Sequence, residues 1–261
     1  MICLKDVYKE YGEKRVLTDI TSELPDRGLT AFIGSNGAGK STMLNIIGRI
    51  LEKDGGTVKI DGKNLENWNH RELAKRISIL SQANHLNIRL TVRELIEFGR
   101  FPYSRGKLTP EDIKKVDETI AFMGLDSYEN RYLDQLSGGQ RQMAYIAMVI
   151  CQDTKYIFLD EPLNNLDMKH SAKLMRLLKT LIERDGKVIY VVIHDVNFVS
   201  TYADYIVALK DGKLLYEGTN EEIVQEKYLT EIFDFNIRIV DIDGQKVCLY
   251  YKYKPGEENI F

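Results

Sequence analysis

The sequence has few of the residues that mark extracellular, metal-binding or membrane-spanning proteins. Its three cysteines, Cys3, Cys151 and Cys248, lie far apart and form no CxxC pair. This spacing argues against a disulfide framework or a zinc site and favours reduced thiols in a cytosolic protein. The longest apolar run extends from Met143 to Cys151, about half of the ~20 residues that a membrane-spanning helix needs. Any work at a membrane would therefore require docking to another chain.

The sequence also lacks a strong excess of charge of either sign. Its formal net charge is −3, so it carries no basic footprint for nucleic acid or anionic lipid. No charged segment followed by an apolar core opens the chain, and we therefore expect no signal peptide. Hydrophobic residues make up 44% of the chain, which is enough for a sizeable core in a soluble globular protein.

Short apolar runs rich in β-branched residues alternate with helical patterns along most of the chain. Several runs are almost entirely apolar, as in parallel strands that are buried on both faces. Helical patterns, such as Ser41–Leu51 and His170–Arg184, lie between them. This alternation predicts an α/β sheet. The predicted strands are Leu29–Ile33, Ile77–Leu80, Tyr156–Leu159, Val188–Ile193 and Ile206–Leu209.

The stretch from Asn87 to Asp153 has a different character. It is mostly helical in pattern, over Thr91–Gly99, Thr109–Phe122 and Gly139–Cys151, with few strand-like runs. We predict that it forms a helical subdomain inserted into the α/β core.

Three Asp-Gly pairs each lie between strand-like runs. This dipeptide supplies the two left-handed positions that a tight hairpin turn requires. The last pair belongs to a hairpin-like segment, Ile237–Tyr251, near the end of the chain. We predict hairpin turns at Asp61-Gly62, Asp211-Gly212 and Asp243-Gly244.

A glycine-rich segment between a predicted strand and a predicted helix fits the pattern GxxxxGK[ST]. In this phosphate-binding loop, known as Walker A, the glycines let backbone N–H groups turn inward around phosphates, and the helix N-terminus adds partial positive charge. Lys40 would place its charge on the β- and γ-phosphates. Ser41 would offer its hydroxyl to Mg²⁺, and Thr42 would reach the α-phosphate. The segment is Gly34-Ser35-Asn36-Gly37-Ala38-Gly39-Lys40-Ser41-Thr42.

Two acidic residues, Asp160 and Glu161, end the predicted strand that begins at Tyr156. Active sites in open α/β sheets lie beyond the carboxyl ends of the strands, so we expect these residues at the same edge as the phosphate loop. Asp160 is expected to bind Mg²⁺, mainly through water. Glu161 is expected to polarise the attacking water as a general base.

The segment Leu136-Ser137-Gly138-Gly139-Gln140 narrows the class further. With the phosphate loop before it and the acidic pair after it, the chain resembles the ABC ATPases, whose signature is LSGGQ. Ser137 and the N–H groups of the two glycines open a helical run and form a second anion-binding helix N-terminus. The resemblance implies that this surface caps the γ-phosphate of an ATP held by the opposite subunit.

Four further residues match elements of the same family, in order along the chain. The resemblance implies that Tyr11 stacks on adenine and that Gln82 senses Mg²⁺ and water and links to the membrane subunit. It also implies that Asp167 belongs to a loop crossing the dimer interface and that His194 contacts the γ-phosphate. The wider family has Ser-x-Leu-Asp at that loop, whereas this chain has Asn164-Asn165-Leu166-Asp167.

The resemblance implies a fold and a division of the chain. The expected fold is a RecA-like P-loop NTPase core with an antiparallel β subdomain and an inserted helical subdomain, the ABC ATPase fold. Residues 1–86 and 154–225 would form the ATP-binding core with the β subdomain. Residues 87–153 would form the helical signature subdomain, and residues 226–261 a C-terminal extension.

Finer features are similar to the ATP-binding subunits of ferric-siderophore importers, notably the runs 160–171 and 194–198 and the segment Gly99-Arg100-Phe101-Pro102-Tyr103. The resemblance implies a peripheral ATPase at the cytoplasmic face of the membrane that uses ATP and Mg²⁺. Its implied partners are a second copy in a head-to-tail homodimer, two membrane permease subunits and, indirectly, an extracytoplasmic siderophore-binding protein. The cargo itself rests on likeness alone, because no residue here would touch it.

Other functions remain as alternatives. Cobalamin, haem or another metal chelate could be the cargo. A soluble ABC ATPase acting on nucleic acid or ribosomes is disfavoured, because the inserted stretch lacks sustained heptads, only one cassette is present and the net charge is slightly acidic. A nucleotide-binding regulator without turnover is disfavoured by the presence of Glu161 and His194.

Overall fold

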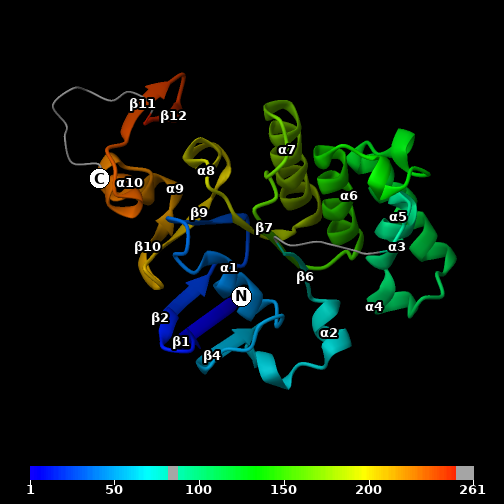
Figure 1. Ribbon diagram of the computed structural model, residues 1–261, viewed down its shortest axis with the longest axis horizontal. Coiled ribbons are helices and arrows are strands. Elements are labelled where there is room, and N and C mark those ends of the chain that lie inside the picture. Colours follow the sequence, from blue (N-terminus) through cyan, green and yellow to red (C-terminus); the bar gives the residue numbers. More distant parts are fainter. Residues whose placement is uncertain (82–87, 251–261) are drawn as a thin grey trace. The chain divides into compact units, whose positions relative to one another are not determined.

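The computed structural model describes residues 1–81 and 88–250. The chain divides into two compact units. The first contains Met1–Leu65 and the chain from Val191 onward, and the second contains Glu66–Tyr190. Figure 1 shows the elements in the order in which they follow one another, from the blue N-terminal strands to the orange C-terminal helix α10 and hairpin β11–β12.

An antiparallel sheet opens the first unit. Among the described residues its strand order is β2-β1-β4-β5, formed by β1 (Ile2–Tyr11), β2 (Lys14–Leu24), β4 (Gly55–Ile60) and β5 (Lys63–Asn64). Along β2 buried and exposed residues alternate, as expected for a sheet with one face in the core. This sheet is the antiparallel β subdomain expected from the sequence.

The first unit also holds the strand that leads into the phosphate loop. This strand, β3 (Leu29–Ile33), is buried at every position and pairs in parallel with β9 (Tyr205–Lys210), which pairs antiparallel with β10 (Lys213–Thr219). The helices of this unit are α1 (Lys40–Ile47), α8 (Val196–Tyr202), α9 (Asn220–Ile223) and α10 (Glu226–Phe233).

The second unit combines a parallel strand pair with most of the helices. Strands β6 (Ile77–Leu80) and β7 (Tyr156–Asp160) pair in parallel, and α3, α5 and α6 pack against one another. The predicted helical insertion is therefore present in the structure (Figure 1). The helices are α2 (His70–Ala74), α3 (Val92–Phe98), α4 (Phe101–Ser104), α5 (Pro110–Met123), α6 (Gly138–Cys151) and α7 (Met168–Asp185).

Strand β8 (Val188–Val192) passes from the second unit into the first. In the second unit the Val188 N–H donates to Lys155 O at 2.9 Å, and in the first the Ile193 N–H donates to Phe32 O at 3.3 Å. Every residue of β8 is buried. The predicted α/β character, with nearly all-apolar parallel strands, is confirmed.

The chain ends its described part in a two-stranded hairpin of β11 (Arg238–Ile242) and β12 (Gln245–Leu249). Its turn, Asp243-Gly244, has positive φ at both residues, 53° and 78°, the geometry of a type I′ hairpin. The pairs at Asp61-Gly62 and Asp211-Gly212 have the same two positive φ angles and also join paired strands. All three predicted turns are confirmed.

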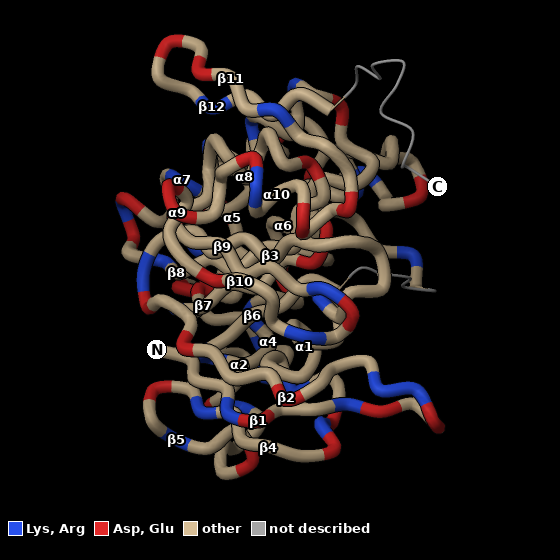
Figure 2. Tube along the Cα trace, turned by 90° about the vertical axis from the view of Figure 1, so that its left-hand side faces the viewer, with Lys and Arg blue, Asp and Glu red and all other residues tan. Residues whose placement is uncertain are grey.

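Acidic and basic residues are interspersed along the chain. Figure 2 shows blue and red segments distributed over both units, without a long stretch of one sign. Among the described residues, no helix is long and apolar enough to cross a membrane.

Candidate functional site

The predicted phosphate loop leaves the end of β3 and enters α1. Three of its glycines, Gly34, Gly37 and Gly39, have positive φ angles of 137°, 81° and 100°. A Cβ at Gly34 would lie 2.0 Å from Leu209 O, and one at Gly39 would lie 2.6 Å from the Leu17 side chain. Backbone conformation and close approach therefore both require glycine in this loop.

Lys40 begins α1 and turns its side chain back into the loop. Its residue is only 5% exposed, and its ammonium donates to the carbonyl oxygens of Gly34 and Ser35, each at 2.8 Å. The next two residues, Ser41 and Thr42, are half-buried in the first turn of the helix. The arrangement gathers a full positive charge, a helix N-terminus and two hydroxyls on one short segment, which suits a polyphosphate.

The other loop residues have the exposure expected of a cradle. Gly34, Ala38 and Gly39 are buried, whereas Asn36 and Gly37 are exposed at the tip of the loop. The Ala38 N–H donates to Ser35 O at 3.2 Å, which closes the loop on itself.

Tyr11 ends β1, and Gly12 at φ 59° begins the turn into β2. Its ring is half exposed, with 53% of the residue accessible. The ammonium of Lys9 lies 5.4 Å from the ring centroid, and Asp54 accepts a hydrogen bond from that ammonium at 2.9 Å. An exposed ring at the end of a strand is available for stacking, so the predicted adenine contact is sterically possible.

His194 follows β8 in the first unit and is exposed. Its neighbour Ile193 donates to Phe32 of β3, the strand that enters the phosphate loop. Asp195 caps the next helix, α8, by accepting from the Asn197 N–H at 2.8 Å. His194 therefore lies between a buried strand and a capped helix, which fixes its backbone.

The acidic pair lies at the end of β7 in the second unit. Asp160 is the last residue of the strand and is 2% exposed, whereas Glu161 lies just beyond it with a φ of 50°. The Asn164 side-chain amide donates to Glu161 Oε2 at 2.5 Å. A buried carboxylate followed by a half-buried one at a strand end matches the predicted pair.

The predicted signature opens α6 in the same unit. Ser137 is its N-cap, with the Gln140 N–H donating to Ser137 Oγ at 3.3 Å and the Ser137 N–H donating to Gln140 Oε1 at 3.0 Å. A Cβ at Gly138 would lie 3.5 Å from Asn165 Cβ, and one at Gly139 would lie 3.1 Å from Asn165 O. The reciprocal capping box satisfies two groups at the helix start.

Asp167 caps the long helix α7. Its carboxylate accepts from the N–H of His170 at 2.8 Å and contacts His170 Nδ1 at 2.8 Å. Two hydrogen bonds hold the pKa of Asp167 below its usual range, that from the His170 backbone having the larger effect and that from its ring the smaller.

Gln82, predicted to sense Mg²⁺ and water, lies outside the residues that the structure describes.

The predicted site residues thus fall into two groups. The phosphate loop, Tyr11 and His194 belong to the first unit, and the acidic pair, the signature residues and Asp167 belong to the second. Two features were missed by sequence analysis, the Asn164 contact to Glu161 and the Lys9 contact to Tyr11. The Lys9–Tyr11 contact could have been predicted, because residues two apart on a strand share one face. The Asn164–Glu161 contact depends on a turn whose conformation the sequence does not reveal.

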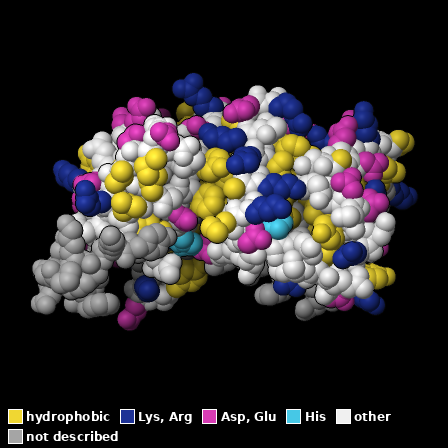
Figure 3. All heavy atoms as spheres, turned by 90° about the horizontal axis from the view of Figure 1, so that it is seen from above, with side chains coloured by type: hydrophobic (Ala, Val, Ile, Leu, Met, Phe, Trp, Pro, Cys, Tyr) yellow, Lys and Arg dark blue, Asp and Glu magenta, His cyan; other side chains and the backbone are white. Residues whose placement is uncertain are grey.

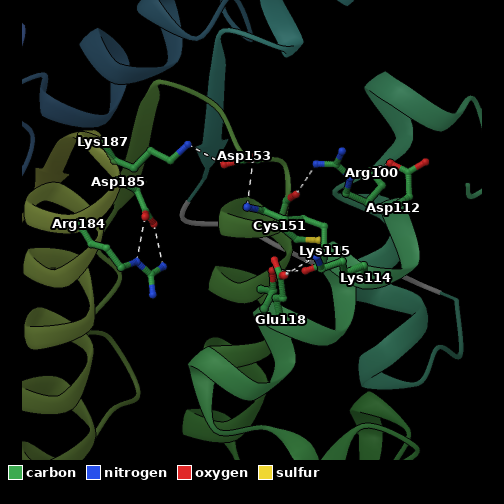
Figure 4. A network of polar contacts seen from close by, with 11 residues as sticks. Arg100, Asp112, Lys114, Lys115, Glu118, Cys151, Asp153, Arg184, Asp185 and Lys187 are labelled. Carbon is green, nitrogen blue, oxygen red and sulfur yellow. Dashed lines mark hydrogen bonds and ion pairs between the residues drawn. The ribbon is translucent and has the colours of Figure 1, made fainter. Parts of the chain in front are cut away.

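A network of charged groups ties the helical insertion together (Figure 4). Asp153, between α6 and β7, contacts Lys187 at 2.7 Å and Lys115 of α5 at 3.2 Å. Burial opposes ionisation of Asp153, but the hydrogen bond and charge of Lys187, with Lys115, outweigh it and lower the pKa of that carboxyl. The carboxylate is thus shared between two cations and holds neighbouring elements together.

The cysteines fit the prediction of reduced thiols. All three are free, and burial raises the pKa of each, to about 11 for Cys151. Among the described residues, no group of three or more His, Cys, Asp or Glu side chains could hold a metal ion. On the face drawn in Figure 3, basic and acidic side chains are interspersed with hydrophobic ones, without a large patch of one charge.

Comparisons with known proteins identify relatives of this chain. The family model described as ABC transporter matches residues 17–164. The petrobactin import ATP-binding protein YclP of Bacillus subtilis is 53% identical over 96% of this chain and 100% of its own. The iron(3+)-hydroxamate import ATP-binding protein FhuC of the same organism is 35% identical over 96% of this chain and 94% of its own.

A solved structure extends the likeness to three dimensions. The dimeric ATP-binding cassette MJ0796, in a post-hydrolysis state bound to ADP and Pi, is 34% identical and covers 84% of this chain and 99% of its own, with a TM-score of 0.76. The observed α/β fold therefore agrees with that of an ATP-binding cassette. The family match over more than half of the chain and the identity to these relatives show that the chain belongs to the ABC transporter family, as one of its ATP-hydrolysing cassettes.

Proposed function

We propose that this ATPase drives the uptake of a ferric siderophore through partner membrane subunits. The observation that carries the proposal is the 53% identity, over nearly the whole chain, to a protein named for petrobactin import. The relative named for iron(3+)-hydroxamate import supports the same class of cargo. Petrobactin is therefore the first siderophore to test.

The chemistry assigned to the site residues follows from their side chains. Lys40 stabilises the negative charge of the β- and γ-phosphates, and Glu161 accepts a proton from the water that attacks the γ-phosphorus. His194 donates a hydrogen bond to the γ-phosphate, where charge is spread in the transition state. The exposed ring of Tyr11 stacks on the adenine.

A divalent cation fits the oxygen donors that the chain offers. The Ser41 hydroxyl and the Asp160 carboxylate are hard ligands of the kind that Mg²⁺ prefers, and Gln82 would add an amide oxygen. When bound, Mg²⁺ supplies charge neutralisation between the β- and γ-phosphates. Asp160, the last residue of β7, and Ser41, in the first turn of α1, are the two side chains that would hold the ion.

Two copies acting head-to-tail would complete the catalytic machinery. The signature residues Ser137, Gly138 and Gly139 form a capped helix N-terminus, which favours an anion such as the γ-phosphate of an ATP held by the other copy. The relative MJ0796 is described as dimeric. In this arrangement the γ-phosphate joins the two copies. Its loss on hydrolysis would therefore shift the equilibrium between a closed and an open dimer toward the open state.

Contact with membrane subunits would be made by the helical insertion. Two aromatic side chains at its surface, Phe98 and Phe101, are 51% and 59% exposed, and a permease segment could cover such apolar groups. The protein would then be peripheral at the cytoplasmic face of the membrane. We further propose the division into an ATP-binding core and β subdomain (1–86 and 154–225), a helical subdomain (87–153) and a C-terminal extension (226–261).

An uptake experiment tests the cargo. Cells that lack this chain are grown with ferric petrobactin, a ferric hydroxamate or a ferric catecholate as sole iron source, and uptake of labelled iron is measured. We expect uptake of one class to be lost, to be restored by the intact chain and not to be restored by Lys40→Ala. Normal uptake of all three would overturn the siderophore assignment and direct the search to cobalamin, haem or another metal chelate.

A further inference from the structure

The turn that follows β7 has an unusual constraint at its first residue. Glu161 has a φ of 50°, a left-handed conformation that is costly for a residue with a Cβ. The Asn164 N–H donates to Glu161 O at 3.2 Å, which closes the turn from 161 to 164. The backbone of Glu161 is therefore fixed in direction by the turn.

The side chains of the same two residues are also joined. Asn164 Nδ2 donates to Glu161 Oε2 at 2.5 Å. This hydrogen bond restricts the side-chain torsions of Glu161 and so fixes the orientation of its carboxylate. For a residue that must accept a proton from a water molecule, this orientation matters as much as basicity.

The rest of the turn is attached to its surroundings. The Leu166 N–H donates to Leu163 O at 3.1 Å, and the Gln142 side chain of α6 donates to Pro162 O at 3.3 Å. The turn then enters α7 through the Asp167 cap. Asn164 is therefore a donor on a supported segment, as a group that orients a catalytic side chain should be.

We propose that Asn164 is a positioning residue for Glu161. Its amide donates to Oε2 and holds the carboxylate in the orientation in which it accepts a proton from the attacking water. In the reaction the water oxygen bonds to the γ-phosphorus, the bond to the bridging β–γ oxygen breaks, and the water proton passes to Glu161. This inference rests on the proposed role of Glu161 as the base. It gives a function to the asparagine that occupies the place of the serine usual in the wider family.

The first test compares three substitutions at Asn164 in the full-length protein. Asn164→Ala removes the donor and should lower kcat about tenfold while leaving the KM for ATP within about twofold, because a misdirected base affects the chemical step rather than binding. Asn164→Asp keeps the shape but places a second carboxylate beside Glu161, so kcat should fall further. Asn164→Ser retains a donor and should recover a large part of the loss. A surface change on the first turn of α7, Lys169→Ala, is the matched control and should leave kcat unchanged.

The second test asks whether Asn164 acts through Glu161. In an Glu161→Gln background, which should turn over only at a residual rate, adding Asn164→Ala should cause no further loss. A full tenfold loss in that background, or a wild-type kcat for Asn164→Ala alone, would overturn the role of Asn164 while Glu161 remained the base. Normal turnover of Glu161→Gln would overturn the base assignment itself and the inference with it. Thermal midpoints within about 2 °C of the wild type would show that the variants are folded.

Discussion

Arg100 and Asp112 form an ion pair in the interior of the helical insertion. The Arg100 Nε donates to Asp112 Oδ1 at 2.9 Å, with side-chain exposures of 9% and 5% (Figure 4). The same guanidinium donates through Nη1 to Cys151 O at 3.0 Å, and Asp112 also accepts from Thr109 at the start of α5. One arginine thus joins the start of α5 to the end of α6.

Removing one partner of this pair should destabilise the protein strongly. Arg100→Met leaves the Asp112 carboxylate buried without its cation, and we expect a loss of about 3–5 kcal/mol in the free energy of unfolding. Urea denaturation of the full chain measures it. The double variant Arg100→Met/Asp112→Leu removes both charges and should recover much of the loss. A single variant as stable as the wild type would show that the pair contributes little.

The Asp112 carboxyl should also make the free energy of unfolding depend on pH. Burial opposes ionisation of Asp112, but hydrogen bonds from Thr109 and from Arg100 outweigh it and hold its pKa below the usual range. A group whose folded pKa is lowered stabilises the fold above its unfolded pKa, near 4, and loses this contribution as the pH falls through its folded pKa. Urea midpoints measured between pH 6 and pH 2 should therefore fall less steeply with acid in Asp112→Asn than in the wild type. Parallel curves would contradict the assignment.

Two glycines of the phosphate loop should respond differently to the same substitution. A Cβ at Gly34 would lie 2.0 Å from the Leu209 carbonyl oxygen, so Gly34→Ala must displace backbone and should impair both folding and nucleotide binding. At Gly37 the positive φ is the main obstacle, because among the described residues nothing lies within 4 Å of an added Cβ. Gly37→Ala should cost about 1 kcal/mol and lower the thermal midpoint by about 2–4 °C. If Gly34→Ala and Gly37→Ala lowered the thermal midpoint of the nucleotide-free protein equally, this reasoning would be wrong.

Loss of the Lys40 ammonium should abolish useful turnover. We expect Lys40→Ala to lower kcat/KM for ATP at least about 100-fold, because a charge aimed at the phosphates is lost. An ATPase assay measures the effect on turnover, and binding of a fluorescent nucleotide measures the effect on affinity. Lys63→Ala, at an exposed position on β5, is the control and should behave as the wild type. Turnover of Lys40→Ala at the wild-type rate would remove this residue from the site.

Glu161→Gln should separate ATP binding from hydrolysis. The amide keeps the shape of the side chain but cannot accept a proton, so the variant should bind ATP, remain dimeric and nearly stop turning over. Size-exclusion chromatography with light scattering measures the dimer in the presence of ATP and Mg²⁺. Adding Lys40→Ala to this variant should return it to the monomer. A variant that hydrolyses ATP normally would show that another group is the base.

Sequence patterns were sufficient for the buried elements and the three hairpin turns. Strands β3 and β6 have the predicted limits, because apolar runs bounded by turn residues mark parallel strands well. The prediction was wrong at the end of the first helix, which stops at Ile47 rather than Leu51. Gly48 caps the helix, and Arg49 has a φ of 56°. Ile50 and Leu51 continue the apolar spacing of the helix in sequence, but they lie in the turn that follows it.

The periodicity of apolar residues cannot predict side-chain contacts within a turn. The Glu161 and Asn164 side chains meet because Glu161 has a left-handed backbone conformation, which is rare for a residue with a Cβ and is not evident from the sequence. The pair of Arg100 and Asp112 likewise depends on how the short helix α4, which Arg100 precedes, is followed by α5, which carries Asp112. Motifs identify which groups carry the chemistry, whereas the supporting hydrogen bonds become visible only with coordinates.

The protonated state of the native thiols has a practical consequence for spectroscopy. Cys151 and Cys248 are buried, and burial raises the pKa of all three thiols, so little thiolate is present at neutral pH. Maleimide dyes and spin labels react through the thiolate and should therefore modify the native cysteines slowly. A single new cysteine at an exposed position, such as Lys169, could carry a probe for distance measurements between two copies without prior removal of the natural ones.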